Sequence, residues 1–273
     1  MLMKQLENEA KKRGCRIVFP EGEDKRIIKA AGIIAKRGIA KPIIINGKAK
    51  GCESIKVKGD SIVYGMLLVK EGKADCCVCG ASHSTLNTIK NALHIIRGEF
   101  ASSFFLYPEK KILFADCALN VDPTSEQLAK IAEQTMQSAK MFGIKPKIAF
   151  LSYSTKGSGK GPSVDKVREA VKIFRMRNPK IKADGELQLD SAVVPAVAKI
   201  KKSSIIKGDA NILIFPNLDA GNIGYKLMER FGKNQALGPV LQGLNKPVSD
   251  LSRGCSVDDI VNVAIITILQ SKK

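Results

Sequence analysis

The chain has 273 residues, which is enough for one large α/β domain or two smaller ones, and it is 44% apolar and 26% charged. This balance excludes intrinsic disorder. A formal net charge of +19, from 45 basic and 26 acidic residues, attracts anions in general. No apolar run reaches the roughly 20 residues of a membrane span, and the acidic N-terminus lacks the apolar core of a signal peptide. We therefore expect a cytoplasmic protein with no membrane partner.

The hydrophobic pattern alternates between short β-branched runs and amphipathic helical segments. This alternation is typical of βαβ units with mostly parallel strands covered on both faces. Such folds bind ligands in the loops at the carboxyl ends of strands. We expect strands at 16–20, 42–46, 74–79, 102–106, 111–115, 147–151 and 211–215, and helices at 24–37, 61–71, 84–96, 125–142, 163–176, 190–201, 222–231 and 257–270.

The basic residues are spread along the chain and are densest from Lys156 to Lys182. The chain has no Trp and only four Tyr, so it offers little surface for stacking bases. We interpret the charge as a generally basic surface. Nucleic acid is not the expected partner, although the charge alone does not exclude it.

Seven cysteines, without a secretion signal, do not predict a disulfide framework. Cys76 and Cys79 have the spacing of a metal or redox pair, but no second pair completes a zinc site. Because they end an apolar run, we interpret them as buried strand residues and expect no metal site.

Two loops that enter helices could bind anions. The first, Cys79–Thr85, offers hydroxyls and backbone N–H groups at a helix start, although capping of the helix by Ser82 or Ser84 explains it equally well. The second, Ser152–Pro162, has three glycines and two lysines, but it departs from the Walker A pattern and does not favour ATP hydrolysis.

A third loop precedes the last helix. Ser256 and Asp259 have the spacing of a capping box, which explains both residues structurally. Capping does not explain Arg253, whose guanidinium concentrates positive potential at the start of the helix. A carboxylate beside it could act as a base, so we prefer the interpretation as a site.

Several motifs resemble phosphate acetyltransferases in order and spacing. They are RIVFPEG at 16–22, ADCA at 115–118, SYSTKGS at 152–158, DGELQ at 184–188, GNIGY at 221–225 and LSRGCSVD at 251–258. Phosphate butyryltransferases are less similar, particularly around 252–259. The resemblance implies reversible transfer of acetyl between CoA and phosphate, directly and in a ternary complex.

The resemblance also implies two three-layer α/β domains with mostly parallel sheets, similar to isocitrate dehydrogenase, with the active site in the cleft between them. The first domain is expected at 1–101, completed by 241–273, and the second at 102–240. It implies no metal and no tightly bound cofactor, with CoA and acetyl-CoA as substrates. A homodimer is the implied assembly.

By the family pattern, Asp259 takes the proton of the CoA thiol, Arg253 holds a phosphoryl or carbonyl oxygen, and Ser252 hydrogen-bonds the thiol or the oxyanion. The residues implied to line the substrate site are Ser84, Thr85, Lys90, Thr155 and Tyr225.

This sequence departs from the family in two places. Lys90 stands where the family usually has an Arg, which keeps the charge but loses the bidentate geometry. Only the stretch from Lys48 to Tyr64 spans a region that is several dozen residues longer in the family and that supplies another CoA-binding Arg. Two alternatives therefore stay open: an acyltransferase for propionyl or butyryl groups, and a non-catalytic basic protein that binds a polyanion.

Overall fold

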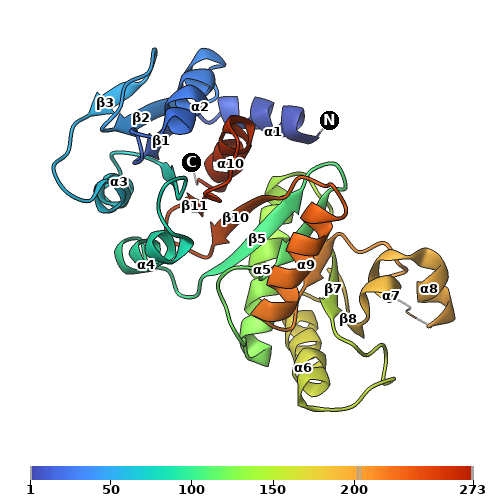
Figure 1. Cartoon of the computed structure of the whole chain (residues 1–273). Helices are drawn as coiled ribbons and strands as arrows, with labels where there is room; N and C mark the ends of the chain where they lie inside the picture. The colour runs from blue at the N-terminus through green and yellow to red at the C-terminus, as the bar shows by residue number, and fades with distance from the viewer. Residues whose placement is uncertain (1, 202, 204, 272–273) are drawn as a thin grey trace. The chain divides into compact units, whose positions relative to one another are not determined.

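The computed structural model describes residues 2–201, 203 and 205–271. The chain forms two compact units. The first contains the residues up to Ala101 and those from Leu237 on, and the second runs from Ser102 to Ala236. Each unit has a mostly parallel sheet with helices packed against it (Figure 1). The predicted α/β class is confirmed.

The first unit has the strand order β3-β2-β1-β4-β11-β10. All neighbours are parallel except β10 and β11, which are antiparallel. Because β1 has β2 on one side and β4 on the other, the loops after β1 and β4 flank the crevice where sheets of this kind bind ligands. The strands are β1 (Arg16–Phe19), β2 (Lys41–Ile45), β3 (Glu53–Ile55), β4 (Cys76–Cys79), β10 (Leu237–Gln242) and β11 (Val248–Asp250).

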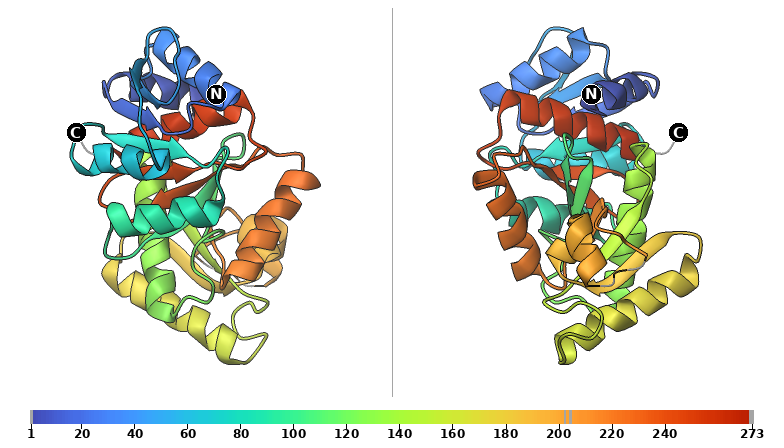
Figure 2. Two further views of the ribbon diagram at one scale, coloured as in Figure 1. Left: turned by 60° about the vertical axis from the view of Figure 1, so that its left-hand side comes forward. Right: turned by 90° about the vertical axis from the view of Figure 1, so that its right-hand side faces the viewer.

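The helices of the first unit pack in two groups. Helix α10 lies against α1 and α2, and helix α3 lies against α4; the contacts of α10 can be followed in Figure 2. Their apolar faces and the strands form a core that includes the fully buried Ile17, Val18 and Cys77. The helices are α1 (Leu2–Lys11), α2 (Lys25–Lys36), α3 (Ser61–Lys70), α4 (Thr85–Ile95) and α10 (Val257–Gln270).

The second unit has the strand order β5-β6-β9-β7-β8. The adjacent runs predicted as two strands form the antiparallel pair β5 and β6, and the other neighbours are parallel. The strands are β5 (Ser102–Tyr107), β6 (Ile112–Ala115), β7 (Lys147–Leu151), β8 (Lys182–Leu187) and β9 (Ile212–Ile214), and the helices are α5 (Ser125–Met141), α6 (Pro162–Arg177), α7 (Leu189–Val193), α8 (Pro195–Ile200) and α9 (Leu218–Arg230).

Five elements were not predicted: α1, β3, β8, β10 and β11. Strand β8 contains Asp184, Gly185 and Glu186 and therefore shows no apolar run. Strand β10 contains Pro239, and β3 and β11 have three residues each. The stretch 190–201, predicted as one helix, is two short helices, because Pro195 holds Val194 in an extended conformation.

Cys76 and Cys79 are fully buried in β4, which confirms their interpretation as strand residues. All seven cysteines are free thiols. Among the described residues, no helix is long and apolar enough to cross a membrane, and no group of three or more His, Cys, Asp or Glu side chains could hold a metal ion.

Candidate functional site

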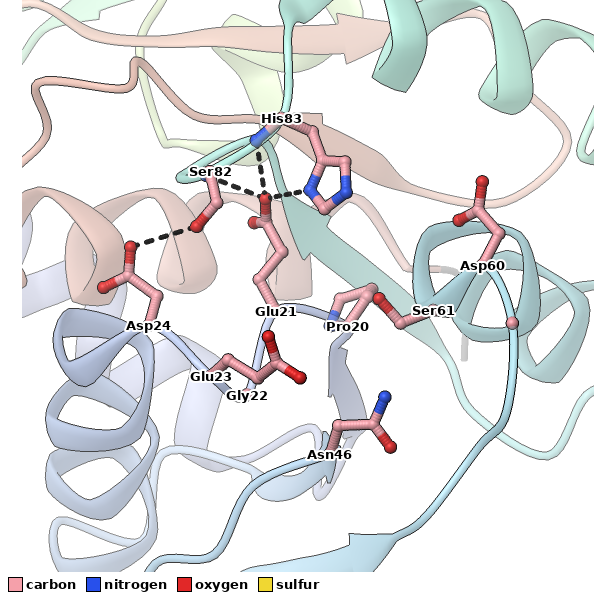
Figure 3. Close-up of a pocket in the computed structure, with 11 residues that line it drawn as sticks. Pro20, Glu21, Gly22, Glu23, Asp24, Asn46, Asp60, Ser61, Ser82 and His83 are labelled. Atoms are coloured by element: carbon pink, nitrogen blue, oxygen red, sulfur yellow. Dashed lines mark hydrogen bonds and ion pairs between the residues drawn. The ribbon is translucent and has the colours of Figure 1, made fainter.

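The loop after β1 carries a buried carboxylate, Glu21, whose side chain is 2% exposed. Its oxygens accept hydrogen bonds from four consecutive backbone N–H groups after β4: Gly80 at 2.8 Å, Ala81 at 2.9 Å, Ser82 at 2.8 Å and His83 at 3.0 Å. The His83 Nδ1 atom lies 2.7 Å from the same carboxylate (Figure 3). Such convergent N–H groups form an anion-binding nest.

The carboxylate of Glu21 fills this nest, so these four N–H groups are not available to an anionic ligand. The expectation that the backbone of the Cys79–Thr85 loop binds an anion is therefore wrong for residues 80–83. The alternative, capping, is confirmed for Ser84, whose hydroxyl accepts a hydrogen bond from the Asn87 N–H at 3.3 Å.

Arg26, in the first turn of α2, joins three loops of the first unit. One nitrogen, Nη1, donates to the carbonyl oxygens of Arg253 at 2.7 Å and Cys255 at 2.9 Å. Nη2 donates to the carbonyl of Ala81 at 2.8 Å and to Asp24 at 2.7 Å. The hydrogen bond from Arg26 lowers the pKa of Asp24 to about 2, so this pair stays charged throughout the neutral range and fixes the loop after β11.

Ser252 and Arg253 follow β11 and are exposed. The Ser252 hydroxyl accepts a hydrogen bond from the Gly254 N–H at 3.3 Å. Within the described part of the chain, the Arg253 guanidinium has neither an ion pair nor a hydrogen bond; the backbone carbonyl of this residue is the group that Arg26 holds. The loop is thus fixed through its backbone, which leaves the cationic side chain available to a ligand.

Asp259 is the third residue of α10, and it forms the predicted capping box. Its Oδ2 accepts hydrogen bonds from the Ser256 N–H at 2.8 Å and from the Ser256 hydroxyl at 2.7 Å. The Asp259 N–H donates to the Ser256 hydroxyl oxygen at 3.1 Å. The structural role of this carboxylate is confirmed, and a chemical role at the helix start stays a prediction.

Asp250, the last residue of β11, is fully buried two residues before Ser252. Neither carboxylate oxygen has a hydrogen-bond partner among the described residues. Its Oδ1 approaches Gly80 so closely that a Cβ there would lie 2.1 Å away. Burial is the main cause that raises the pKa of Asp250 to about 6.

We expect the protein to lose stability as the pH rises, and we expect Asp250→Asn to reduce this loss. The folded pKa of about 6 exceeds the ordinary 3.8, so ionisation of Asp250 destabilises the fold between about pH 4 and pH 8, by roughly 2 kcal/mol. Urea unfolding at both pH values measures this difference. Asp219→Asn, at an exposed carboxylate, controls for the charge change. Equal pH dependence in the wild type and Asp250→Asn would contradict the expectation.

In the second unit, Thr155 is buried and its hydroxyl is engaged. It accepts a hydrogen bond from the Gln188 N–H at 2.9 Å and lies 3.4 Å from the Ser191 hydroxyl. The same loop is organised by Glu186, which accepts from the Gly157 N–H at 2.8 Å and from Arg168 at 3.0 Å. Burial opposes ionisation of Glu186, but Arg168 and the backbone N–H groups outweigh it and lower its pKa to about 2.

Lys156, one of the two lysines of this loop, is not available to bind an anionic ligand. Its ammonium group forms an ion pair with the fully buried Asp184 and donates to the Gly185 carbonyl at 3.3 Å. The Tyr225 ring stacks on Phe105 with 4.0 Å between centroids. Thr155 and Tyr225 therefore have clear structural roles within their unit.

The structure brings two groups of the predicted residues to one sheet edge. Strands β4 and β11 are parallel neighbours, with Asp250 opposite Cys79. The loops that follow them, and the first turn of α4, carry exposed side chains at that edge: Ser84, Thr85, Ser252 and Arg253. Lys90 is exposed in the middle of α4. Thr155 and Tyr225 belong to the second unit.

Sequence reasoning missed Glu21, Asp24, Arg26 and Asp250 as organisers of this edge. A signal was present, because Glu21 and Asp24 lie in the loop after a buried strand and Asp250 ends one. Polar residues at that point of a parallel strand lie at the ligand-binding edge. Nothing in the spacing shows that Glu21 bonds to a loop about sixty residues away.

Comparisons with known proteins agree with these motifs. The chain matches the family described as phosphate acetyl/butaryl transferase over residues 1–58 and 50–268. It is 40% identical to the phosphate acetyltransferase of Bacillus subtilis over 319 aligned positions, which cover 99% of each chain. A crystal structure of a phosphotransacetylase from Streptococcus pyogenes is similar, with a TM-score of 0.89 and 40% identity over 98% of each chain.

A branched-chain phosphotransacylase from Enterococcus faecalis is also similar, with a TM-score of 0.80 and 25% identity over 94% of this chain and 100% of that chain. The alignment with the Bacillus protein has 319 positions against 273 residues here, a difference of 46. The two stretches that match the family overlap at residues 50–58. The alignment therefore contains gaps in this chain, and the match to the family is divided near β3.

Proposed function

This chain belongs to the phosphate acetyl/butaryl transferase family, and on that premise we propose that it converts acetyl-CoA and phosphate reversibly into acetyl phosphate and CoA. Membership of this family makes the protein an acyltransferase. The observation that carries the proposal is the 40% identity to a phosphate acetyltransferase over nearly the whole chain. The sequence around Ser252, Arg253 and Asp259, on which the resemblance rests, supports it.

In the direction of acetyl-CoA synthesis, Asp259 takes the proton of the CoA thiol, which at neutral pH is only a few per cent thiolate. The sulfur attacks the acetyl carbonyl, and the carbon–oxygen bond to phosphate breaks in the second step. Arg253 stabilises the oxyanion or the phosphoryl oxygens, and Ser252 hydrogen-bonds the thiol or the oxyanion. The exposure of the Arg253 side chain supports this role.

We propose direct transfer in a ternary complex, without an acyl-enzyme intermediate. Burial raises the pKa of Cys255, the thiol next to the Ser252 loop, to about 11, although Arg26 partly opposes the shift. Burial also raises the pKa of Cys117 well above its ordinary value. Both thiols are thus poor nucleophiles at neutral pH. Bringing the two substrates together supplies much of the acceleration, and initial-velocity plots should intersect.

The proposed substrate-lining residues are Ser84, Thr85, Lys90, Thr155 and Tyr225. Ser84 and Thr85 are supported by their exposure at the edge that also carries Ser252, and Lys90 is supported by its exposure on the helix that begins there. Lys90 acts as a point charge for phosphate, because it lacks the planar fork of arginine. We propose no metal and no tightly bound cofactor, with CoA and acetyl-CoA acting as substrates.

The proposal is tested by phosphate-dependent release of free thiol from acetyl-CoA, propionyl-CoA and butyryl-CoA. We expect the highest kcat/KM with acetyl-CoA. A longer acyl chain stays the second candidate, because a relative is named a branched-chain phosphotransacylase and one methylene changes discrimination by only about 1–3 kcal/mol. A higher kcat/KM with butyryl-CoA would select that candidate.

A non-catalytic protein that binds a polyanion is supported only by the net charge of +19. It predicts retention on DNA or RNA that weakens steeply with salt. A folded preparation without phosphate-dependent thiol release, but with such retention, would favour this alternative over the acetyltransferase.

We propose that the protein is a homodimer that functions in acetate metabolism in the cytoplasm. Seven free thiols suit a reducing compartment. Support for the dimer comes from α9 and its end, where Ile223, Leu227 and Phe231 recur at a spacing of four residues and are exposed by 58%, 51% and 83%. Such a stripe is typical of an interface.

We expect the double substitution Leu227→Glu and Phe231→Glu to convert a dimer into a monomer, because two charges would be buried without partners. Light scattering after size exclusion measures the mass. Met176→Glu, at an exposed apolar residue away from this stripe, should leave the mass unchanged. A wild-type monomer at micromolar concentration would refute the assembly.

A further inference from the structure

Helix α4 and its N-cap carry three of the proposed substrate-lining residues, yet the helix is attached to its unit by apolar packing. Ile89, Ala92 and Ile95 are buried, and the helix packs against α3 and β11. Among the described residues, no hydrogen bond or ion pair joins 85–95 to another helix or strand. Because apolar contacts are non-directional, they only loosely fix the first turn of α4 relative to β11.

Two buried polar side chains lie where α4 meets β11. Asp250 is the last residue of β11 and Thr88 is the fourth residue of α4, and both are fully buried. Neither oxygen of the Asp250 carboxylate and no described neighbour of the Thr88 hydroxyl completes a hydrogen bond. Burial is the main influence on the pKa of Asp250 and raises it, and Thr88 is close enough to act on that pKa as well. The two unpaired groups are therefore neighbours.

The other surroundings of the Asp250 carboxylate offer it no partner. A Cβ on Gly80 would lie 2.1 Å from Oδ1 and 2.8 Å from the Leu251 nitrogen, so the end of β4 closes one side. The nearby carboxylate of Glu21 is itself an acceptor, filled by the N–H groups of residues 80–83. Thr88 is thus the enclosed donor that is available to Asp250.

An unpaired carboxylate and an unpaired hydroxyl in a buried place are both unfavourable. The Thr88 hydroxyl can donate to Asp250 whether the carboxyl group is ionised or protonated, because an acceptor oxygen remains in both forms. Pairing the two groups draws the first turn of α4 toward the end of β11. The residues at the start of α4 and Ser252, two residues after Asp250, lie on the same two segments, so the pairing also sets their separation.

We propose that Asp250 and Thr88 are positioning residues, whose hydrogen bond forms when phosphate binds and holds α4 against β11. This inference rests on the proposed function, because phosphate is the substrate that bridges the two segments. A phosphate held by the hydroxyls at the start of α4 and by Ser252 and Arg253 draws the segments together. The buried pair then gains the partners that it lacks, which favours the bound arrangement.

The substitution Thr88→Val tests this inference, because valine keeps the shape of threonine and removes the hydroxyl. We expect the KM for phosphate to rise about tenfold and kcat to change by less than about threefold. Urea unfolding without phosphate should show no loss of stability, since the hydroxyl that is removed has no partner in the described structure. A hydroxyl with only a structural role would give the opposite result, with lower stability and an unchanged KM.

Three further variants serve as controls. Thr88→Ser restores the hydroxyl and should return the KM to within about twofold of the wild type. Thr135→Val removes a fully buried hydroxyl of the second unit that donates to the Ile131 carbonyl at 2.7 Å, and it should lower stability without changing the KM. In an Asp250→Ala background, Thr88→Val should add little, because both residues form one hydrogen bond. Additive effects on the KM would overturn the proposal.

Calorimetric titration with inorganic phosphate separates this inference from the proposed function, because it requires no turnover. We expect the wild type and Thr88→Ser to bind phosphate and Thr88→Val to bind it about tenfold more weakly. Acetyl transfer by the wild type, with equal phosphate binding by Thr88→Val, would overturn the positioning role and leave the function standing. Weakened binding by Thr88→Val in a protein without acetyl transfer would support the positioning role and overturn the function. A wild type that neither binds phosphate nor transfers acetyl would overturn both.

Discussion

Replacing Arg253 by alanine is expected to lower kcat by about 100-fold or more, because removal of one donor to a developing oxyanion typically has an effect of this size. The guanidinium is exposed and makes no contact with the described residues that the fold needs. Arg26 holds the loop through the backbone carbonyl of residue 253, and this hydrogen bond survives the substitution. The loss should therefore appear in turnover and not in stability.

Steady-state kinetics and urea unfolding of the same preparations separate the two effects. Arg253→Lys keeps the charge and should recover only part of the activity, since it lacks the bidentate fork. Arg97→Ala, at another exposed arginine of the first unit, controls for the charge. An Arg253→Ala protein with wild-type kcat would remove Arg253 from the mechanism.

Replacing Glu21 by alanine is expected to destabilise the first unit by about 3–5 kcal/mol. The substitution leaves four buried or partly buried N–H groups, those of residues 80–83, without their carboxylate acceptor. It also frees the His83 ring. Because residues 80–83 lead into α4, the KM for phosphate should rise as well.

Urea unfolding of Glu21→Ala, Glu21→Gln and the exposed neighbour Glu23→Ala measures this expectation. The glutamine keeps one acceptor oxygen and should lose less stability than the alanine. Glu23→Ala should unfold like the wild type, because no hydrogen bond or ion pair of its side chain occurs in the described structure. Similar stabilities for Glu21→Ala and Glu23→Ala would show that the nest of N–H groups does not need its internal anion.

The fold was predictable where local pattern and tertiary packing agree. Helix α2 was expected at 24–37 and spans Lys25–Lys36, since its apolar residues recur at helical spacing. Strands without an apolar run could not be recognised. In β8, for example, Asp184 and Glu186 are buried because Lys156 and Arg168 pair with them from elsewhere in the chain.

The candidate site residues could be predicted from the family motifs. Arguments from residue chemistry and spacing predicted only part of the site. Capping explains Ser256 and Asp259, but spacing alone cannot show whether a cap also acts as a base. The filling of the nest by Glu21 and the anchoring of Arg253 by Arg26 depend on contacts between distant segments. These contacts arise from strand order, which a single sequence does not encode locally.

The measurement that tests this account most directly is the formation of acetyl phosphate from acetyl-CoA and phosphate by the purified protein, trapped with hydroxylamine as the hydroxamate. We expect product in proportion to the thiol released, only when phosphate is present, and at least about 100-fold more slowly with Arg253→Ala. A folded wild-type protein that forms no acetyl phosphate, or an Arg253→Ala protein that forms it at the wild-type rate, would contradict the account.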